Sequence, residues 1–298
     1  MTDFKQAIIS ELEVLRRVSA KEAGGTFKVR NYAAAIKKLA ELPGVWTVAD
    51  AAGIGGEKIQ EKIAAIIGGS FVMTDAVRAK AAALDAFQKI YGVGPAVAEK
   101  LVAAGYTSIA GLRASGYKLT TNQQIGLRYY EDLLERIPRA EMEVHAALLL
   151  GAVAAVGMTG EIVGSYRRGA ASSGDIDMLV TGGALEPLVA RLKAAGYIKE
   201  VLAMGEHKCL AISAVAGGRA RRLDLLVTPA EELPFALVYF TGSMELNVAM
   251  RSRALERGYT LNEHALTRVK TGARITGITS EKELFKVLGF DWKEPRER

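Results

Sequence analysis

The chain has 298 residues, half of them hydrophobic, and a formal net charge of +6. This length is enough for two or three domains with cores of their own, and the positive balance favours a polyanionic partner. A single cysteine, Cys209, excludes an internal disulfide and a cysteine-cluster zinc site. The sequence shows no signal peptide, and no apolar run reaches the roughly 18 residues of a membrane span. We therefore expect a soluble, intracellular protein.

The first part of the chain predicts helices. Apolar residues at helical spacing indicate helices over 3–18 and 28–41, and Pro43-Gly44 ends the second. A helical pattern then continues to Ile137-Pro138. This region is therefore expected to be all-helical.

Two similar units interrupt the helical pattern. Each is predicted to be a short helix, a Gly-apolar-Gly hairpin and a second helix, with hairpins at Gly53-Ile54-Gly55 and Gly92-Val93-Gly94. Glycine permits positive φ, so backbone N–H groups can point outward at the second helix's N-terminus. Such a geometry binds a nucleic-acid phosphate without reading the bases.

The second half predicts a mixed α/β region with antiparallel character. A helix over 141–156 leads into a strand at Ile162-Val163. Further strands are predicted at 176–181, 208–215 and 222–228, with a helix at about 185–195 between the first two. After a glycine turn, a helix ending near Arg257 and a small mixed segment close the chain.

The run from Gly164 to Asp177 indicates the chemistry. It ends in two aspartates, Asp175 and Asp177, and residues i and i+2 of a strand share one face. Two carboxylates this close repel each other unless divalent cations lie between them. The Gly/Ser-rich loop before them supplies backbone N–H groups, a hydroxyl and two arginines, which suit a triphosphate. The combination implies nucleotidyl transfer.

A third carboxylate is expected near the pair, because two metal ions about 3.5–4 Å apart need shared ligands. Asp224 provides it on a predicted strand whose apolar residues Leu223, Leu225 and Val227 lie on the opposite face. The alternative for Asp224 is a surface salt bridge with Arg222.

These residues together resemble the family X DNA polymerases, and the resemblance covers nearly the whole chain. It rests on the run 164–177, on Arg222-x-Asp224, and on further segments at 92–94, 124–130, 136–139, 239–243, 258–263 and 292–298. It implies an α+β multidomain fold, in the minimal form of lyase-like and polymerase domains. We expect a helical lyase-like domain over 1–76 and a helical DNA-binding subdomain over 77–138, each with a helix-hairpin-helix motif. A nucleotidyltransferase-type palm over 139–238 and a nucleotide-selection subdomain over 239–298 follow.

The resemblance also implies roles for individual residues. Asp175 and Asp177 would bind two Mg²⁺ ions, with Mn²⁺ as the alternative, and Asp224 would complete the catalytic metal site and accept the proton of the primer 3′-hydroxyl. Arg167 is expected to be structural or solvated, and Met244 stands where a family member has an aspartate. The expected nucleotide-binding residues are Arg136, Gly164, Ser165, Arg168, Gly174, Tyr239, Phe240, Gly242 and Asn247. The expected DNA-binding residues are Lys28, Tyr32, Gly53, Gly55, Lys58, Gly92, Gly94 and Arg251.

A second activity is implied for the N-terminal region. Lys62 corresponds to the family's Schiff-base lysine for removing a 5′-deoxyribose phosphate, and Lys58 lies on the same helix face. A nearby cation lowers a lysine's pKa and makes its amine a better nucleophile. Two positions depart from the pattern, because Phe27 replaces a histidine and Ala49 a lysine. The alternative is a phosphate-binding face without covalent chemistry.

The predicted function is template-directed DNA synthesis that fills short gaps in base excision repair. Its expected partners are gapped or nicked DNA and dNTPs, without a membrane, and a monovalent cation is implied at each hairpin. A monomer is expected, in the nucleus of a eukaryote or the cytoplasm of a bacterium. The alternatives are a small-molecule or tRNA nucleotidyltransferase, which the paired hairpins disfavour, and a non-catalytic DNA-end-binding protein, which the three aspartates disfavour.

Overall fold

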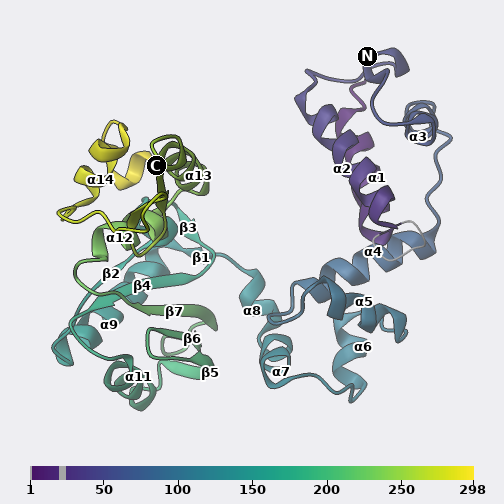
Figure 1. The fold of residues 1–298 in the computed structure, drawn as a ribbon. Coiled ribbons are helices and arrows are strands. Elements are labelled where there is room, and N and C mark those ends of the chain that lie inside the picture. Colours follow the sequence, from purple (N-terminus) through teal and green to yellow (C-terminus); the bar gives the residue numbers. More distant parts are fainter. Residues whose placement is uncertain (1, 20–24) are drawn as a thin grey trace. The chain divides into compact units, whose positions relative to one another are not determined.

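The computed structural model describes residues 2–19 and 25–298 (Figure 1). The chain divides into two compact units, residues 1–128 and 129–298. The first is helical and the second is built on a mixed sheet, as the sequence predicts.

The first unit contains seven α-helices and one 3₁₀ turn within its described residues. Ile8, Leu12, Ala35, Leu39 and Ile63 form much of the core shared by its first three helices. The helices predicted at 3–18 and 28–41 are confirmed as α1 and α2. The elements are α1 (Lys5–Val18), α2 (Gly25–Glu41), η1 (Val48–Ala51), α3 (Glu57–Ile67), α4 (Asp75–Gln88), α5 (Pro95–Ala103), α6 (Ile109–Ala114) and α7 (Thr121–Arg128).

The two hairpins differ from their prediction in two details. A 3₁₀ turn, not an α-helix, precedes the first hairpin. Gly53, Gly55 and Gly92 have positive φ values of 74°, 75° and 80°, whereas Gly94 has φ −85° and caps α5. The proline after Gly94 disfavours other backbone regions for it. Three of the four predicted glycines therefore adopt the positive φ that glycine permits.

The second unit is centred on a five-stranded sheet of order β2-β4-β7-β6-β5. The β4 and β7 strands are parallel, and the other neighbours are antiparallel. Its first elements are α8 (Tyr130–Leu134), β1 (Ile137–Pro138), α9 (Arg139–Ala155), β2 (Thr159–Ile162), α10 (Gly164–Arg167), β3 (Ser172–Ser173), β4 (Ile176–Thr181), α11 (Leu185–Ala194), β5 (Ile198–Met204), β6 (Lys208–Ser213) and β7 (Arg221–Val227).

Alternating residues of the strands enter two cores. Met178, Val180 and Leu225 pack with residues of α9 and α11, while Leu179 and Leu226 pack with Ala236 of α12 (Leu233–Thr241). Both faces of the central strands are thus covered, which explains their nearly continuous apolar sequence.

Three parts of this unit differ from the prediction. The helical pattern stops at Leu134, and Ile137–Pro138 instead pairs with Ser172–Ser173 as a short ribbon. The edge strand β5 was not predicted, because its register shifts twice against β6 and breaks the alternation of buried residues. The expected subdomain boundary between residues 238 and 239 falls inside α12.

The remaining elements pack around α12. Phe235, Val238, Met250, Leu266 and Phe285 lie in their shared core. The elements are α13 (Met244–Glu256), β8 (Tyr259–Leu261), β9 (Leu266–Arg268), α14 (Glu281–Leu288) and η2 (Pro295–Glu297).

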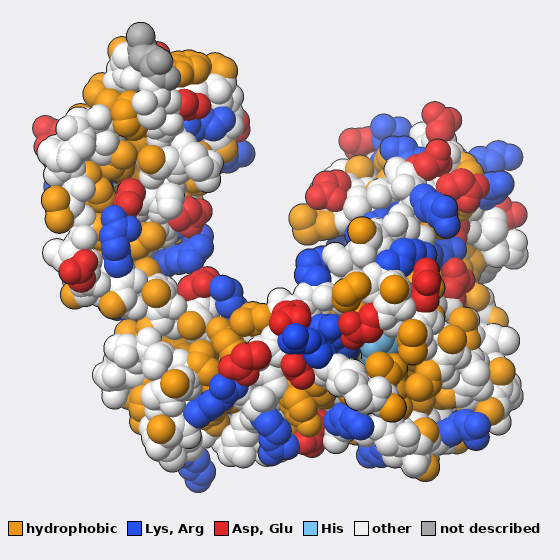
Figure 2. Space-filling view, turned by 180° about the vertical axis from the view of Figure 1, so that it is seen from behind, with side chains coloured by type: hydrophobic (Ala, Val, Ile, Leu, Met, Phe, Trp, Pro, Cys, Tyr) orange, Lys and Arg blue, Asp and Glu red, His pale blue; other side chains and the backbone are white. Residues whose placement is uncertain are grey.

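The positive net charge is dispersed on the face shown in Figure 2, where Lys and Arg side chains alternate with Asp and Glu. Binding of a polyanion there would depend on particular sites rather than on one continuous basic surface. No helix in the described part of the chain is both long and apolar enough to cross a membrane.

A buried guanidinium fastens α8 and α9 to the start of β7. The Arg221 side chain is 3% exposed and lies 2.7 Å from Glu141 of α9. It donates to both carboxylate oxygens of Glu141 and to the backbone carbonyls of Asp132 and Glu135 at the end of α8. The bond to Arg221 is the main cause that lowers the pKa of Glu141. One side chain thus adds hydrogen bonds to two carbonyls at the end of α8, where the helical pattern of hydrogen bonds runs out.

We expect Arg221→Met to destabilise the second unit by about 3 kcal/mol, because it removes the bidentate partner of the Glu141 carboxylate and a donor to the Glu135 carbonyl. The double variant Arg221→Met/Glu141→Leu should regain part of this loss. The chain has two tryptophans, Trp46 and Trp292, one in each unit. Urea unfolding followed by Trp292 fluorescence in a Trp46→Phe background measures the effect. An unchanged midpoint would contradict a structural role for the ion pair.

Candidate active site

Adjacent parallel strands bring the predicted carboxylates together. In the register of β4 with β7, Asp177 pairs with Asp224. Asp175 precedes the first residue of β4, so it lies in the loop rather than on the strand as expected. Gly164 lies against this group, since a Cβ there would be 2.8 Å from Oδ2 of Asp177. The start of the phosphate loop and the carboxylates therefore form one site.

Crowding of negative charge dominates the electrostatics of this site. Burial, followed by the charges of Asp175 and Asp224, raises the pKa of Asp177 to about 7. Burial also raises the pKa of Asp224, against the opposing effect of Arg222 and Lys208. Ionised carboxylates in such surroundings have a strong affinity for a cation.

Two basic side chains that were not predicted as site residues meet these carboxylates. Arg222 Nη2 lies 2.7 Å from Asp175 Oδ2 and 3.9 Å from Asp224 Oδ1. Lys208 Nζ lies 3.7 Å from Asp224 Oδ2. The alternative salt bridge of Asp224 with Arg222 is thus present, although the shorter contact of Arg222 is with Asp175.

The carboxylates suit a divalent cation by charge and donor type, because Mg²⁺ prefers oxygen ligands. Within residues 2–19 and 25–298, no group of three His, Cys, Asp or Glu side chains is placed to hold a metal ion as the side chains stand. In this arrangement Arg222 occupies one oxygen of Asp175.

The predicted triphosphate residues meet around the loop. Arg136 donates from Nε to Ser172 Oγ at 2.7 Å and from Nη2 to the Ser172 carbonyl at 2.6 Å. Ser165 Oγ donates to Ser173 Oγ at 2.9 Å. A Cβ on Gly174 would lie 3.9 Å from Arg136 Nη1. A guanidinium, hydroxyls and a glycine backbone therefore converge beside the carboxylates, as an anion site requires.

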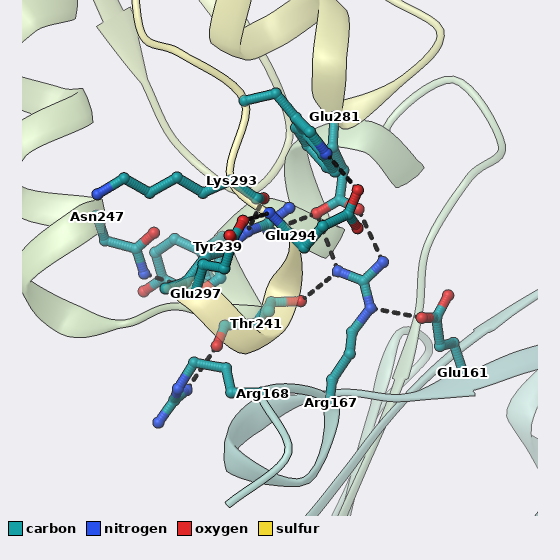
Figure 3. Close-up of polar contacts among 12 residues, drawn as sticks. Glu161, Arg167, Arg168, Tyr239, Thr241, Asn247, Glu281, Lys293, Glu294 and Glu297 are labelled. Carbon is teal, nitrogen blue, oxygen red and sulfur yellow. Dashed lines mark hydrogen bonds and ion pairs between the residues drawn. The ribbon is translucent and has the colours of Figure 1, made fainter.

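The turn after α12 is attached to the same loop (Figure 3). Arg168 Nη1 donates to the Thr241 carbonyl at 2.6 Å, and a Cβ on Gly242 would lie 3.2 Å from that nitrogen. Asn247 Nδ2 donates to the Tyr239 carbonyl at 2.7 Å. The structure thereby connects expected nucleotide-binding residues of α10, α12 and α13.

The aromatic pair at the end of α12 is packed against neighbouring side chains. The rings of Tyr239 and Phe240 pack edge to face, with centroids 4.9 Å apart. The Arg251 guanidinium lies 5.1 Å from the Tyr239 ring centroid. Met244, at the start of α13, is 74% exposed next to this group.

Arg167 holds the loop from the other side, which confirms its expected structural role (Figure 3). It donates to both carboxylate oxygens of Glu281, at 3.0 and 2.7 Å, and to Thr241 Oγ1 at 2.8 Å. It also pairs with Glu161, and Arg298 donates to the same Glu281 at 2.7 Å. Glu281 was not predicted, because no sequence pattern connects residues 114 positions apart.

The expected lyase residues lie on α2 and α3, whose apolar faces share one core. Lys58 is exposed and Lys62 half-buried, and Lys62 Nζ donates to the Lys58 carbonyl at 3.2 Å. Lys28 and Tyr32 lie four residues apart on α2. Of the two departing residues, Phe27 is 71% exposed and Ala49 belongs to η1.

Three models of known polymerase domains match consecutive stretches of the chain. They are the fingers domain of DNA polymerase lambda over residues 85–134, the DNA polymerase beta palm over 136–230 and the DNA polymerase beta thumb over 236–298. The chain belongs to family X of the DNA polymerases. Within this family, the sequence motifs predict the greatest likeness to DNA polymerase beta. The palm and thumb models agree with this prediction, and the fingers model adds a likeness to DNA polymerase lambda.

Whole-chain relatives support the family X assignment. The chain is similar to DNA polymerase lambda of Rattus norvegicus, with 33% identity over 326 residues, covering 100% of this chain and 56% of the relative. DNA polymerase lambda of Arabidopsis thaliana is 33% identical over 248 residues, covering 74% of this chain and 47% of the relative. The family X chain thus spans about half the length of these relatives.

We expect metal-free protein to lose stability as the pH rises from about 4 to about 7. The folded pKa of Asp177 is about 7 and the ordinary value is 3.8, so the folded state binds the proton more tightly. The shift corresponds to a loss of up to about 4 kcal/mol above pH 7. Urea unfolding of wild type and Asp177→Asn in EDTA measures it. The variant should be the more stable at pH 8 and equal to wild type at pH 4, and Mg²⁺ should reduce the difference. Parallel stability curves would refute the raised pKa.

We expect Arg167→Met to destabilise the second unit by about 3 kcal/mol, because Glu281 loses its bidentate partner. Arg167→Lys, the matched control, keeps the charge without the planar fork and should lose less. A double-mutant cycle with Glu281→Gln should give a coupling of about 1–3 kcal/mol. Additive effects of the two single changes would show that the pair does not stabilise the fold.

Proposed function

We propose that this chain adds deoxynucleotides from dNTPs to a primer 3′-hydroxyl, directed by a template, and fills short gaps in base excision repair. The observation that carries the proposal is the pairing of Asp177 with Asp224 beside a loop that already gathers a guanidinium and hydroxyls. Family membership supports the reaction class.

In the proposed reaction, Asp175, Asp177 and Asp224 hold two Mg²⁺ ions, with Mn²⁺ as the alternative. Bound divalent ions lower the pKa of the primer hydroxyl and neutralise the triphosphate. Asp224 accepts the hydroxyl proton, a role favoured by the burial that raises its pKa. Ser165, Gly164 and Gly174 bind phosphate oxygens.

Arginine, aromatic and asparagine side chains orient the nucleotide in the proposed reaction. Arg136 and Arg168 bind the outer phosphates, since a guanidinium can meet two oxygens at once. Tyr239 and Phe240 select the sugar. Hydrogen bonds from Asn247 to the Tyr239 carbonyl and from Arg168 to the Thr241 carbonyl hold the end of α12 that carries them. Arg251 and Asn247 face the nascent base pair.

In the first unit, the proposed role is to bind DNA at both hairpins. The first hairpin binds a 5′-phosphate through Gly53, Gly55 and Lys58, together with Lys28 and Tyr32. The second hairpin binds the DNA backbone through Gly92 and Gly94. Lys62 forms a Schiff base with a 5′-deoxyribose phosphate. We propose that the chain has four parts, over 1–76, 77–138, 139–238 and 239–298, and that it acts as a monomer. The proposed location is the nucleus in a eukaryote or the cytoplasm in a bacterium.

The test uses a one-nucleotide-gapped duplex with a 5′-deoxyribose phosphate, Mg²⁺ and each dNTP. Wild type should extend the primer with the templated nucleotide and be trapped on DNA by borohydride. Asp224→Ala should lose extension by about 10³-fold or more, because it removes an interaction worth several kcal/mol, yet keep DNA binding. Lys62→Ala should lose trapping alone, and Glu61→Ala, a change at an exposed neighbour on the same helix, serves as its control.

The two activities fail separately. Absence of templated extension by wild type would refute the polymerase proposal. Extension without Lys62-dependent trapping would refute only the lyase, and would leave the first hairpin as a phosphate-binding face.

A further inference from the structure

Two backbone carbonyls of the first hairpin meet on a single side-chain amide. Gln60 Nε2 donates to the Ala51 carbonyl at 3.0 Å and to the Ile54 carbonyl at 2.6 Å. Carbonyl oxygens only accept hydrogen bonds, so the NH₂ group of the amide must be the one that faces them. Both protons of this group are thereby used.

The amide closes the turn that carries the hairpin glycines. The Ile54 N–H donates to the Ala51 carbonyl at 3.2 Å around Gly53, whose φ is 74°. Gln60 lies on α3, four residues after the cap residue Gly56. Its two hydrogen bonds therefore fasten the turn to the helix whose N-terminus follows it.

The second hairpin has the same turn without this amide. The Val93 N–H donates to the Ile90 carbonyl at 3.0 Å around Gly92, as in the first hairpin. Four residues after its cap residue Gly94 stands Ala98, which is fully buried and has no donor. Gln123 of α7 donates its amide to a different carbonyl, that of Gly92.

The family resemblance implies a monovalent cation at each hairpin. Convergent carbonyl oxygens are cation ligands, but here the Ala51 and Ile54 oxygens face the positive end of the Gln60 amide. A cation at this position would be repelled by those N–H groups. The first hairpin therefore does not fit a cation with Gln60 as it stands.

We propose that the Gln60 amide replaces the monovalent cation at the first hairpin, so that this hairpin binds a DNA 5′-phosphate independently of K⁺ and Na⁺. The inference rests on the proposed 5′-phosphate binding of this hairpin, and it corrects the prediction of a cation at both hairpins.

The experiment compares two gapped duplexes that differ only in a 5′-phosphate or a 5′-hydroxyl at the downstream strand. Binding of the full chain to each is measured by anisotropy in potassium chloride and in choline chloride of equal ionic strength. The Kd for the 5′-hydroxyl duplex divided by the Kd for the 5′-phosphate duplex, called the Kd ratio below, isolates the 5′-phosphate contact from other DNA contacts. For wild type, we expect this ratio to be the same in both salts.

Two variants reveal the replaced ion. Gln60→Ala opens the carbonyls, so its Kd ratio should fall about 10-fold in choline, the worth of two lost hydrogen bonds, and recover in potassium. Gln60→Glu, whose carboxylate attracts a cation, should depend on potassium at least as strongly. Glu61→Ala, an exposed neighbour on α3, should behave like wild type.

A wild-type ratio that falls in choline as much as that of Gln60→Ala would overturn the proposal. A wild-type ratio of one in both salts would instead refute 5′-phosphate binding itself. Thermal unfolding of the first unit, followed by Trp46 in a Trp292→Phe background, still decides the inference in that case. Potassium should then stabilise Gln60→Ala more than wild type, and equal stabilisation would overturn the replacement.

Discussion

The parallel pairing of β4 with β7 imposes the constraint on which the active site depends. It holds two carboxylates in register on neighbouring strands, and the loop before β4 adds a third. Apolar cores on both faces of the sheet fix this pairing, so the negative charges cannot move apart. The electrostatic cost of this burial and repulsion appears in the raised pKa of Asp177. The positive charges of Lys208 and Arg222 beside the carboxylates offset part of this cost. The crowded carboxylates thus lower the free energy of unfolding of the metal-free protein and raise its affinity for cations.

The phosphate loop is held between this charge cluster and the C-terminal segment. Gly164 touches the carboxylates, while the next two arginines of the loop reach Thr241 and Glu281. Movement of the end of α12, which carries Tyr239, would therefore be transmitted to the loop through Arg168 and Arg167. Nucleotide selection and phosphate binding are mechanically connected by these two side chains.

Local patterns were sufficient to predict the elements that carry the chemistry. The period of apolar residues predicts α1, α9 and β4 within a few residues. The spacing of Asp175 and Asp177 predicts that they lie together, and the need of two metal ions for a third carboxylate predicts Asp224 beside them. The partners of these residues were harder to find. Glu281, Lys208 and Gln60 look like ordinary surface residues of helices and strands, and their roles arise from contacts that no local pattern encodes. The edge strand β5 was missed because its bulges interrupt the two-residue period.

The anchoring of Arg298 has a practical consequence. Its side chain is fully buried, donates to Glu281 and stacks on Phe285 and Trp292. Because Glu281 also holds Arg167, loss of the Arg298 side chain would remove a partner of the anion that secures the phosphate loop. A fluorescent label that displaces this side chain would report on a loosened loop, so labels for single-molecule work are better attached elsewhere.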